Sequence, residues 1–339
     1  MEVEAYRLVG MTGSPRPALV VRGTGSIGRR HLCLLNALES GIAVGVPVQT
    51  RSIGELQSLG LPVWTQASAP PSLIGTVVAT NTRRHAIDSI EWLRYGPVLC
   101  EKPLVASTTQ LADVNAAMVT AGHAVYAAYC LRFDSALRMF AGKLSLLGRI
   151  HTVRIEAESY LPQWRPGTDH RASYSAREDE GGVLRDLSHE LDYAIWLFGK
   201  PQEVSAVVRR SGELDIAADD AADVQWMTPD GAVISVHLNY LTREPRRRMR
   251  AAGSRGEVAW DGVTQEVSWS LDGKTDHRRF TDSPDDKYIR QAQAFLSACR
   301  GGDAASLATF EDGAFVVNVI DAAFRSSQTG RRAAVNGVI

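Results

Sequence analysis

The sequence lacks several features that define large classes of proteins. Its four cysteines form no Cys-x-x-Cys pair and no short framework, so neither a zinc site nor a disulfide scaffold is implied. No apolar run reaches the ~18 residues of a membrane span. The net charge of −1 lacks the basic excess of nucleic-acid or membrane-surface proteins. We therefore expect a cytoplasmic protein with reduced thiols that binds neither nucleic acid nor membrane.

Lysine is scarce as well, with only five lysines in a chain whose lysines and arginines together number 37. The remaining composition is ordinary. Hydrophobic residues make up 45% and charged residues 22%, which is typical of a folded enzyme and excludes a mostly disordered chain. The length of 339 residues predicts two domains. Residues 1–17 carry Glu2 and Glu4 and no long apolar core, so we expect no secretory signal there.

Short apolar strands alternate with helices in the first part of the chain. This α/β alternation predicts a doubly wound parallel sheet with helices on both faces. We assign it to a domain over residues 18–130. The expected strands are 18–21, 42–49, 77–79, 98–100 and 124–129, and the expected helices are 29–38, 84–95 and 108–121.

The pattern changes near residue 150, where polar and apolar residues begin to alternate with a period of two. Turn signals separate the alternating segments, which indicates a largely antiparallel sheet. We expect an α+β domain over residues 131–339. Its strands are predicted at 150–159, 203–210, 222–227, 232–241, 256–260 and 266–271, and its helices at 187–198, 288–299 and 306–326.

A Gly-x-Gly-x-x-Gly motif lies between the first predicted strand and the helix that follows it. Gly23 permits a tight turn, Gly25 allows the backbone to approach a pyrophosphate, and Gly28 allows close helix–strand packing. The alternative is a plain strand-to-helix turn. In this context the motif favours dinucleotide binding, with Ser26 and Ile27 at the start of the helix as further cofactor contacts.

The end of the second predicted strand bears on the choice of cofactor. An acidic residue there favours NAD, but this sequence has Arg51 and Ser52. Arg51 is suited to pair with a 2′-phosphate, and Ser52 to donate a hydrogen bond to it. A solvated arginine at a strand end is the alternative. We therefore predict NADP, with NAD possible.

Two further segments carry candidate catalytic residues. Glu101 and Lys102 follow the strand 98–100, at the sheet edge where ligands bind, and both are candidate cofactor contacts. The lysine can also donate to a substrate oxygen as a catalytic group. Asp186, His189 and Asp192 are spaced three apart in a predicted helix, which puts His189 within reach of Asp186. A structural cap with a satisfied histidine is the alternative. No further ligand is spaced for zinc, so we predict no metal.

The substrate candidates lie in loops and in a basic run. Tyr160, Trp164 and Arg165 share one loop that leads to Tyr174, and such side chains suit a polyhydroxylated ring; a surface lid without contacts is the alternative. Arg243, Arg246–Arg248 and Arg250 form the basic run. It suits a nucleotide-sugar diphosphate or a carboxylate, or else forms a solvated or interface strand.

Taken together, these elements resemble the Gfo/Idh/MocA family, the group of glucose–fructose oxidoreductase and inositol dehydrogenase. The resemblance covers about residues 18–330. It is carried by the segments GTGSIGRRH (23–31), ATNTRRH (79–85), CEKPL (100–104), YCLRF (129–133) and GGVLRDLSHELDYAIWLFG (181–199).

The resemblance implies an N-terminal Rossmann domain and a C-terminal α/β domain whose open sheet forms much of a subunit interface. A homodimer or homotetramer is therefore expected. The catalytic lysine falls on Lys102 and the catalytic histidine on His189. Thr80, Asn81 and His85 match the segment that lines the nicotinamide.

Within the resembling segments, Arg132 and Asp192 are added as substrate-binding candidates. Three positions depart from the family pattern. Asp186 is three residues before His189 instead of four, Cys130 stands where asparagine is common, and Arg22 precedes the glycine motif.

The sequence therefore predicts an NAD(P)-dependent oxidoreductase. It is expected to transfer a hydride to or from a secondary alcohol or ketone carbon of a sugar or sugar derivative, free or nucleotide-linked. Lys102, His189 and Asp186 are the predicted catalytic residues. The alternatives are an enzyme that recycles its bound cofactor, giving net elimination, glycoside cleavage or epimerisation, and a non-catalytic dinucleotide sensor.

Overall fold

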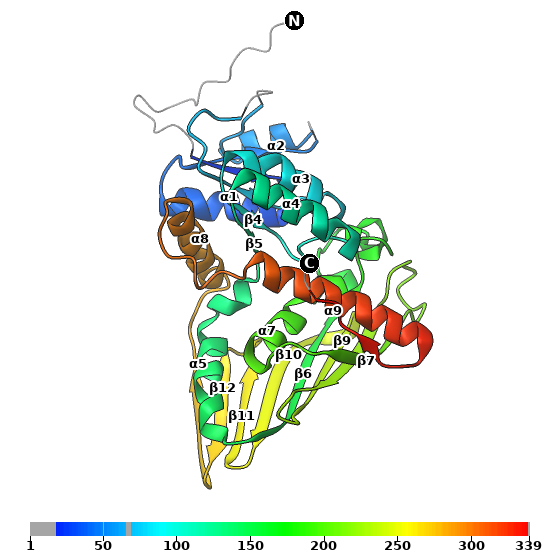
Figure 1. Cartoon of the computed structure of the whole chain (residues 1–339). Coiled ribbons are helices and arrows are strands. Elements are labelled where there is room, and N and C mark those ends of the chain that lie inside the picture. Colours follow the sequence, from blue (N-terminus) through cyan, green and yellow to red (C-terminus); the bar gives the residue numbers. More distant parts are fainter. Residues whose placement is uncertain (1–17, 50, 66–68, 338–339) are drawn as a thin grey trace, which may run out of the picture.

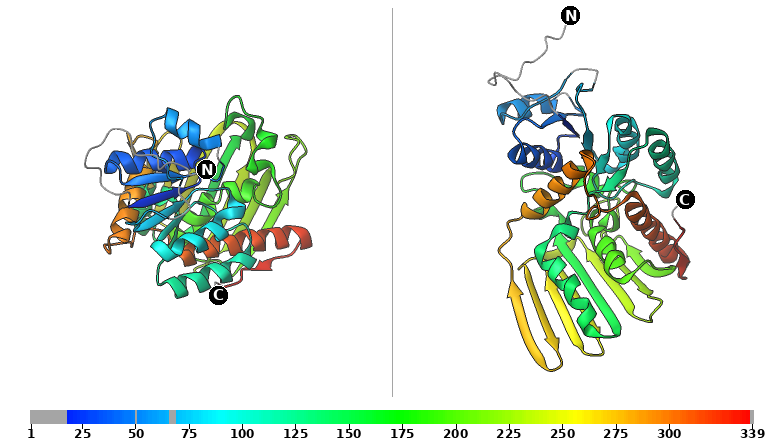
Figure 2. Two further views of the ribbon diagram at one scale, coloured as in Figure 1. Left: turned by 90° about the horizontal axis from the view of Figure 1, so that it is seen from above. Right: turned by 60° about the vertical axis from the view of Figure 1, so that its left-hand side comes forward.

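The computed structural model describes residues 18–49, 51–65 and 69–337, which fold around two β-sheets (Figure 1). Helices pack on both faces of the N-terminal sheet but on only one face of the C-terminal sheet (Figure 2). No helix in the described residues is both long enough and apolar enough to cross a membrane.

The N-terminal sheet has five parallel strands in the order β2-β1-β3-β4-β5, which confirms the predicted doubly wound sheet. Its strands are short apolar runs buried on both faces, as parallel strands require. The strands are β1 (Leu19–Arg22), β2 (Ala43–Val46), β3 (Gly75–Val78), β4 (Val98–Cys100) and β5 (Val125–Ala127); the helices are α1 (Ser26–Leu38), α2 (Arg51–Ser58), α3 (His85–Trp92) and α4 (Leu111–Ala121).

The C-terminal sheet has nine strands in the order β13-β12-β11-β10-β6-β9-β8-β7-β14. Only its β6–β9 pair is parallel, so the predicted largely antiparallel sheet is confirmed. The strands are β6 (Ile150–Tyr160), β7 (Glu203–Arg209), β8 (Ala221–Met227), β9 (Val233–Asn239), β10 (Leu241–Gly253), β11 (Gly256–Asp261), β12 (Glu266–Leu271), β13 (Lys274–Arg279) and β14 (Ala333–Ala334).

One face of this sheet is covered by α5 (Ser135–Lys143), α7 (His189–Phe198) and α9 (Phe310–Thr329) (Figure 1). Alternate residues of β6, namely Val153, Ile155 and Ala157, are buried under these helices. The helix α8 (Asp286–Cys299) returns to the N-terminal half and packs against α1 (Figure 2). The two halves therefore share apolar contacts, which fixes the junction between the sheets.

Several local predictions need correction. The strand expected over 42–49 ends at Val46, because Pro47 has no N–H to continue the ladder. Arg51 therefore begins α2 instead of ending a strand, and Thr50 and the side chains of Arg51 and Ser52 lie outside the described residues.

The helix expected over 187–198 is interrupted. A short helix, α6 (Val183–Asp186), ends before Leu187, and α7 begins at His189. Three strands were not predicted as such, the two-residue β14 among them. β10 contains the basic run, and every residue of β13 is exposed, so neither shows the polar–apolar pattern of a half-buried strand.

Candidate functional site

The glycine motif forms the turn from β1 to α1. Gly23 has a φ of +89°, a conformation that favours glycine, and a Cβ there would lie 2.7 Å from the carbonyl carbon of Ala79. A Cβ on Gly28 would lie 2.0 Å from the carbonyl oxygen of Gly23. Both positions therefore require glycine for steric reasons, as the sequence predicted.

Gly25 has a different environment. It is the N-cap of α1 without a side-chain cap, and a Cβ built on it would meet nothing within 4 Å. The first N–H groups of a helix have no partner within the helix, so those of Ser26 and Ile27 are placed to bind an anion. This open glycine turn fits the pyrophosphate of a dinucleotide.

Arg22, the unusual residue before the motif, has a buried partner. Its Nε lies 3.3 Å from Oδ1 of Asp88 on α3, and its Nη1 donates to the carbonyl oxygen of Pro47. Asp88 is fully buried and also binds Arg84 at 2.7 Å. The arginine therefore ties the ends of β1 and β2 to α3 without leaving Asp88 unpaired.

His85 joins two loops at the edge of the parallel sheet. Its Nδ1 lies 2.8 Å from the carbonyl oxygen of Pro103, and its Nε2 lies 3.0 Å from that of Thr80. Burial lowers the pKa of this histidine. Its ring is thus held between main-chain oxygens of the loops that follow β3 and β4, next to the exposed Asn81.

Glu101 is anchored in the same region. Its carboxylate lies 2.8 Å from Nε2 of His31 on α1. Burial raises the pKa of Glu101, but the hydrogen bond to His31 and the nearby Lys102 outweigh it, and the pKa is lowered. An ionised carboxylate thus fixes the loop that carries Lys102 to the helix of the glycine motif.

Lys102 reaches from the N-terminal half to the C-terminal half. Its Nζ donates to the carbonyl oxygen of Asp186 at 2.5 Å. This contact places the ammonium group three residues from His189, across 84 positions of the chain. The Lys102 charge also acts on His189 and lowers its pKa, so the structure places both residues in one region.

His189 is the first residue of α7 and is 9% exposed. Its ring packs edge-on against Tyr129 with a centroid distance of 5.5 Å, and its buried Nδ1 has no hydrogen-bond partner in the described residues. Burial lowers its pKa well below 6.5, and the charges of Lys102, Arg247 and Lys287 lower it further. The imidazole is therefore neutral at neutral pH and able to accept a proton.

Asp186 does not hydrogen-bond to His189, contrary to the expected reach between them. The break between α6 and α7 separates the two side chains. The Asp186 carboxylate instead accepts a hydrogen bond from the hydroxyl of Tyr240 at 2.7 Å. The main-chain carbonyl oxygen of Asp186, and not its carboxylate, binds Lys102.

Arg132 and Asp192 bind each other. Nη2 of Arg132 lies 2.7 Å from Asp192 Oδ1, and its Nη1 lies 2.9 Å from Asp312 Oδ2 on α9. Burial disfavours the guanidinium charge, but these carboxylates raise the pKa of Arg132 above its usual value. The contacts favour a structural clamp between residues 130–133, α7 and α9, and Asp192 makes no hydrogen bond to His189.

The loop that carries Trp164 and Arg165 packs against two tyrosines near Asp186. Trp164 donates to Ser159 at 3.0 Å and packs edge-on against Tyr240 at 5.2 Å. The Arg165 guanidinium lies 5.4 Å from the ring of Tyr174. Of the three loop candidates, Trp164 and Arg165 thus lie over residues that surround Asp186.

The third loop candidate, Tyr160, has a different neighbour. The guanidinium carbon of Arg243 lies 4.4 Å from the centroid of its ring.

Sequence reasoning missed Tyr240 and Lys287, and it named Tyr174 only as the residue to which the loop with Trp164 leads. The Asp186 charge raises the pKa of Tyr174, with burial adding to the effect, so these groups are close. Lys287 lies on α8 and lowers the pKa of His189. The scarcity of lysine could have pointed to Lys287, because only five lysines occur in the chain. Tyr240 lies in a segment without a local motif.

No group of three or more His, Cys, Asp or Glu in the described residues could hold a metal ion.

The chain matches a family model described as the oxidoreductase family, C-terminal alpha/beta domain, over residues 145–335. An inositol 2-dehydrogenase of Paenarthrobacter aurescens is 27% identical over 316 residues, covering 86% of this chain and 90% of that protein. A D-xylose 1-dehydrogenase (NADP(+)) of Haloferax volcanii is 26% identical over 332 residues, covering 91% of this chain and 97% of that protein.

Solved structures share the fold. Levoglucosan dehydrogenase in complex with NADH superposes with a TM-score of 0.82 at 18% identity, covering 95% of this chain and 100% of that chain. An aldose-aldose oxidoreductase of Caulobacter crescentus complexed with glycerol gives a TM-score of 0.81 at 20% identity, covering 94% and 100%. These likenesses confirm the predicted fold.

Proposed function

Since the chain belongs to the Gfo/Idh/MocA oxidoreductase family, we propose that it transfers a hydride between NAD(P) and a CH–OH carbon of a sugar or sugar derivative. The names of the relatives, an inositol and a xylose dehydrogenase, support a polyhydroxylated substrate. The observation that carries the proposal is the contact of Lys102 with Asp186, which joins the loop beside the glycine motif to the segment that presents His189.

His189, Lys102 and Asp186 each have a separate role in the proposed reaction. A bound nicotinamide supplies the hydride acceptor or donor. In the oxidative direction, His189 takes the hydroxyl proton at Nε2, since its Nδ1 is buried. Lys102 donates to the same oxygen and stabilises its developing negative charge. Asp186 holds Lys102 through its carbonyl oxygen and is itself positioned by Tyr240.

The preferred cofactor is proposed to be NADP, because Arg51 begins α2 just beyond the end of β2, near the expected site of the adenosine ribose. We expect NADPH to bind more tightly than NADH, by roughly tenfold or more for a charge-assisted contact. Fluorescence titration of both cofactors measures the difference.

Arg51→Ala should remove most of this preference. Arg94→Ala is the matched control, because Arg94 is exposed and, in the part of the chain that the structure describes, donates only to the carbonyl oxygen of Glu91. Equal affinity of the unsubstituted protein for NADPH and NADH would contradict the role of Arg51 and leave the proposed reaction standing.

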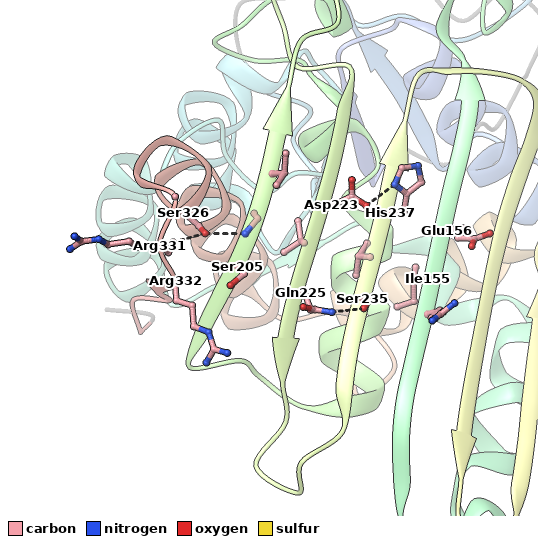
Figure 3. A pocket seen from close by; sticks show the side chains of 16 residues that line it. Ile155, Glu156, Ser205, Asp223, Gln225, Ser235, His237, Ser326, Arg331 and Arg332 are labelled. Carbon is pink, nitrogen blue, oxygen red and sulfur yellow. Dashed lines mark hydrogen bonds and ion pairs between the residues drawn. The ribbon is translucent and has the colours of Figure 1, made fainter.

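We propose further that the uncovered face of the nine-stranded sheet binds a second copy of the chain. This face carries a groove of about 600 Å³ between β7, β8, β9 and β6 (Figure 3). Acidic and basic side chains both line the groove, and Nδ1 of His237 lies 2.8 Å from Oδ1 of Asp223. Apolar side chains are exposed as well, since Val207 is 62% and Met227 60% exposed. Such a mixed, partly apolar face suits self-association.

Val207→Arg should therefore convert a dimer or tetramer into smaller species, because it places a charge in the contact. Val119→Arg on α4 is the control, since Val119 is 78% exposed and lies on the other half of the molecule. Sedimentation analysis distinguishes the species. A monomeric unsubstituted protein would contradict the proposal.

A cytoplasmic location is also proposed. All four cysteines are free, and Cys33 is exposed. An exposed free thiol suits a reducing compartment.

A further inference from the structure

The basic run on β10 is divided between the two faces of the sheet. Arg246, Arg248 and Arg250 lie on the uncovered face, where each pairs with a carboxylate of a neighbouring strand. Their partners are Glu158, Asp261 and Glu257. These three arginines therefore form a ladder of surface ion pairs.

Arg247 lies on the opposite face, toward α7. Its Nε donates to Oε1 of Glu190 at 2.8 Å, and Glu190 is fully buried and adjacent to His189. The Arg247 side chain is nevertheless 31% exposed. A partly exposed guanidinium fixed at its Nε beside the catalytic histidine is placed to meet a ligand with its terminal nitrogens.

Further cations surround the same residues. Lys287 donates from α8 to the carbonyl oxygen of Pro284 at 3.1 Å, and Lys102 donates to that of Asp186. In the described part of the chain, neither ammonium lies within 4.0 Å of a carboxylate. The charges of Lys102, Lys287 and Arg247 all act on His189, and Arg165 lies over Tyr174 nearby.

This arrangement brings cations to the site from four separate segments, with the carboxylates of Glu101, Asp186 and Glu190 among them. In the described residues, the terminal nitrogens of Arg247 and the Lys287 ammonium make no hydrogen bond to a carboxylate, and a neutral sugar offers no charge for them to meet. A carboxylate or phosphate matches them, since guanidinium groups bind these anions through paired hydrogen bonds.

We infer that the substrate carries an anionic group, a carboxylate or a phosphate ester, and that Arg247 binds this group while Lys287 adds to the attraction. The inference rests on the proposed function and narrows its substrate class to acidic sugar derivatives. Arg247 is thus a specificity-determining residue, and the outer arginines of the same strand are not.

The test uses the cofactor-loaded protein and matched pairs of neutral and acidic sugars. The pairs are D-glucose with D-glucuronate, D-galactose with D-galacturonate, and D-glucose with D-glucose 6-phosphate. Binding is measured by the fluorescence of the reduced nicotinamide, and turnover by its absorbance. We expect the acidic member of at least one pair to bind about tenfold or more tightly than its neutral partner. A preference for uronates identifies a carboxylate, and a preference for the phosphate identifies a phosphate ester.

Arg247→Gln should abolish the preference, and Arg248→Gln should preserve it. Because Arg247→Gln leaves the buried Glu190 without its cation, Arg247→Lys is included to retain the charge and is expected to keep part of the preference. Thermal unfolding reports whether each variant is folded.

Two results would overturn the inference: equal binding of neutral and acidic members in every pair, or equal effects of the Arg247 and Arg248 variants. Turnover of neutral sugars without any acid preference would overturn it and leave the proposed function intact. Failure to bind either cofactor would instead count against the proposed function.

Discussion

Replacing Lys102 by methionine is expected to lower kcat by a factor of about 10²–10³, the usual loss when a group that stabilises an oxyanion is removed. Methionine keeps the unbranched shape of the side chain but cannot donate a hydrogen bond to the reacting oxygen. Cofactor affinity should change little, because the proposed pyrophosphate site, the Gly23–Gly28 turn and the start of α1, does not include this ammonium. Steady-state kinetics together with cofactor titration separates the two effects.

The control for this variant is Lys143→Met. Lys143 is another of the five lysines, but it lies on α5, with its Nζ 3.7 Å from the ring centroid of Trp269. Its replacement should leave kcat unchanged. If Lys102→Met instead weakened cofactor binding as much as it slowed turnover, Lys102 would be a binding residue and not a catalytic one.

His189→Asn is expected to lower kcat by about 10²–10⁴-fold, the range for loss of a general base. The pH dependence gives a sharper test. Burial and the charges of Lys102, Arg247 and Lys287 lower the pKa of His189 well below 6.5, so the neutral, proton-accepting form prevails at and above that pH. The rate of substrate oxidation should therefore stay level from weakly alkaline pH down to 6.5 and fall only in more acidic solution.

In the His189→Asn variant this acidic limb should disappear along with most of the rate. An inflection at or above pH 6.5 that the substitution removes would contradict the assigned environment of the imidazole. An unchanged profile with a low rate would show that another group accepts the proton. His123→Asn serves as the control, because His123 lies just beyond the end of α4.

The sequence predicted the parts of this protein that depend on neighbouring residues. The positive φ of Gly23 and the close approach of Gly28 to the Gly23 main chain are both properties of the turn itself, so the motif was sufficient to predict them. The alternation of short apolar strands with helices was sufficient to predict the parallel sheet. The loop after β4 that carries Lys102 was placed for the same reason, since parallel strands end at a common sheet edge.

The polar contacts of the site depend on residues far apart in the chain. Asp186 is bound by Tyr240, 54 positions away, and Arg132 by Asp312, 180 positions away. Spacing within a helix suggested other partners, because it took no account of the break between α6 and α7. No pattern among neighbouring residues predicts hydrogen bonds between side chains so far apart in the sequence.

The orientation of Arg247 illustrates the same limit within a single strand. The pairing of β10 with β6 shifts register between Leu241 and Arg246, so that both residues lie opposite positions of the same face of β6. Alternation counted from Leu241 would place Arg247 on the uncovered face. The irregularity, which contains Pro245, reverses the count and turns Arg247 toward Glu190; a proline in a strand marks such a bulge but does not give the register beyond it.

The central claim is that the protein carries out net hydride transfer to or from the nicotinamide, and an isotope experiment tests it most directly. A substrate deuterated at the reacting carbinol carbon is incubated with oxidised cofactor, and both products are examined by mass spectrometry. The account predicts one deuterium in the reduced cofactor for each molecule of ketone formed. Product that accumulates without any net reduced cofactor would contradict it and would indicate a cofactor recycled within each turnover.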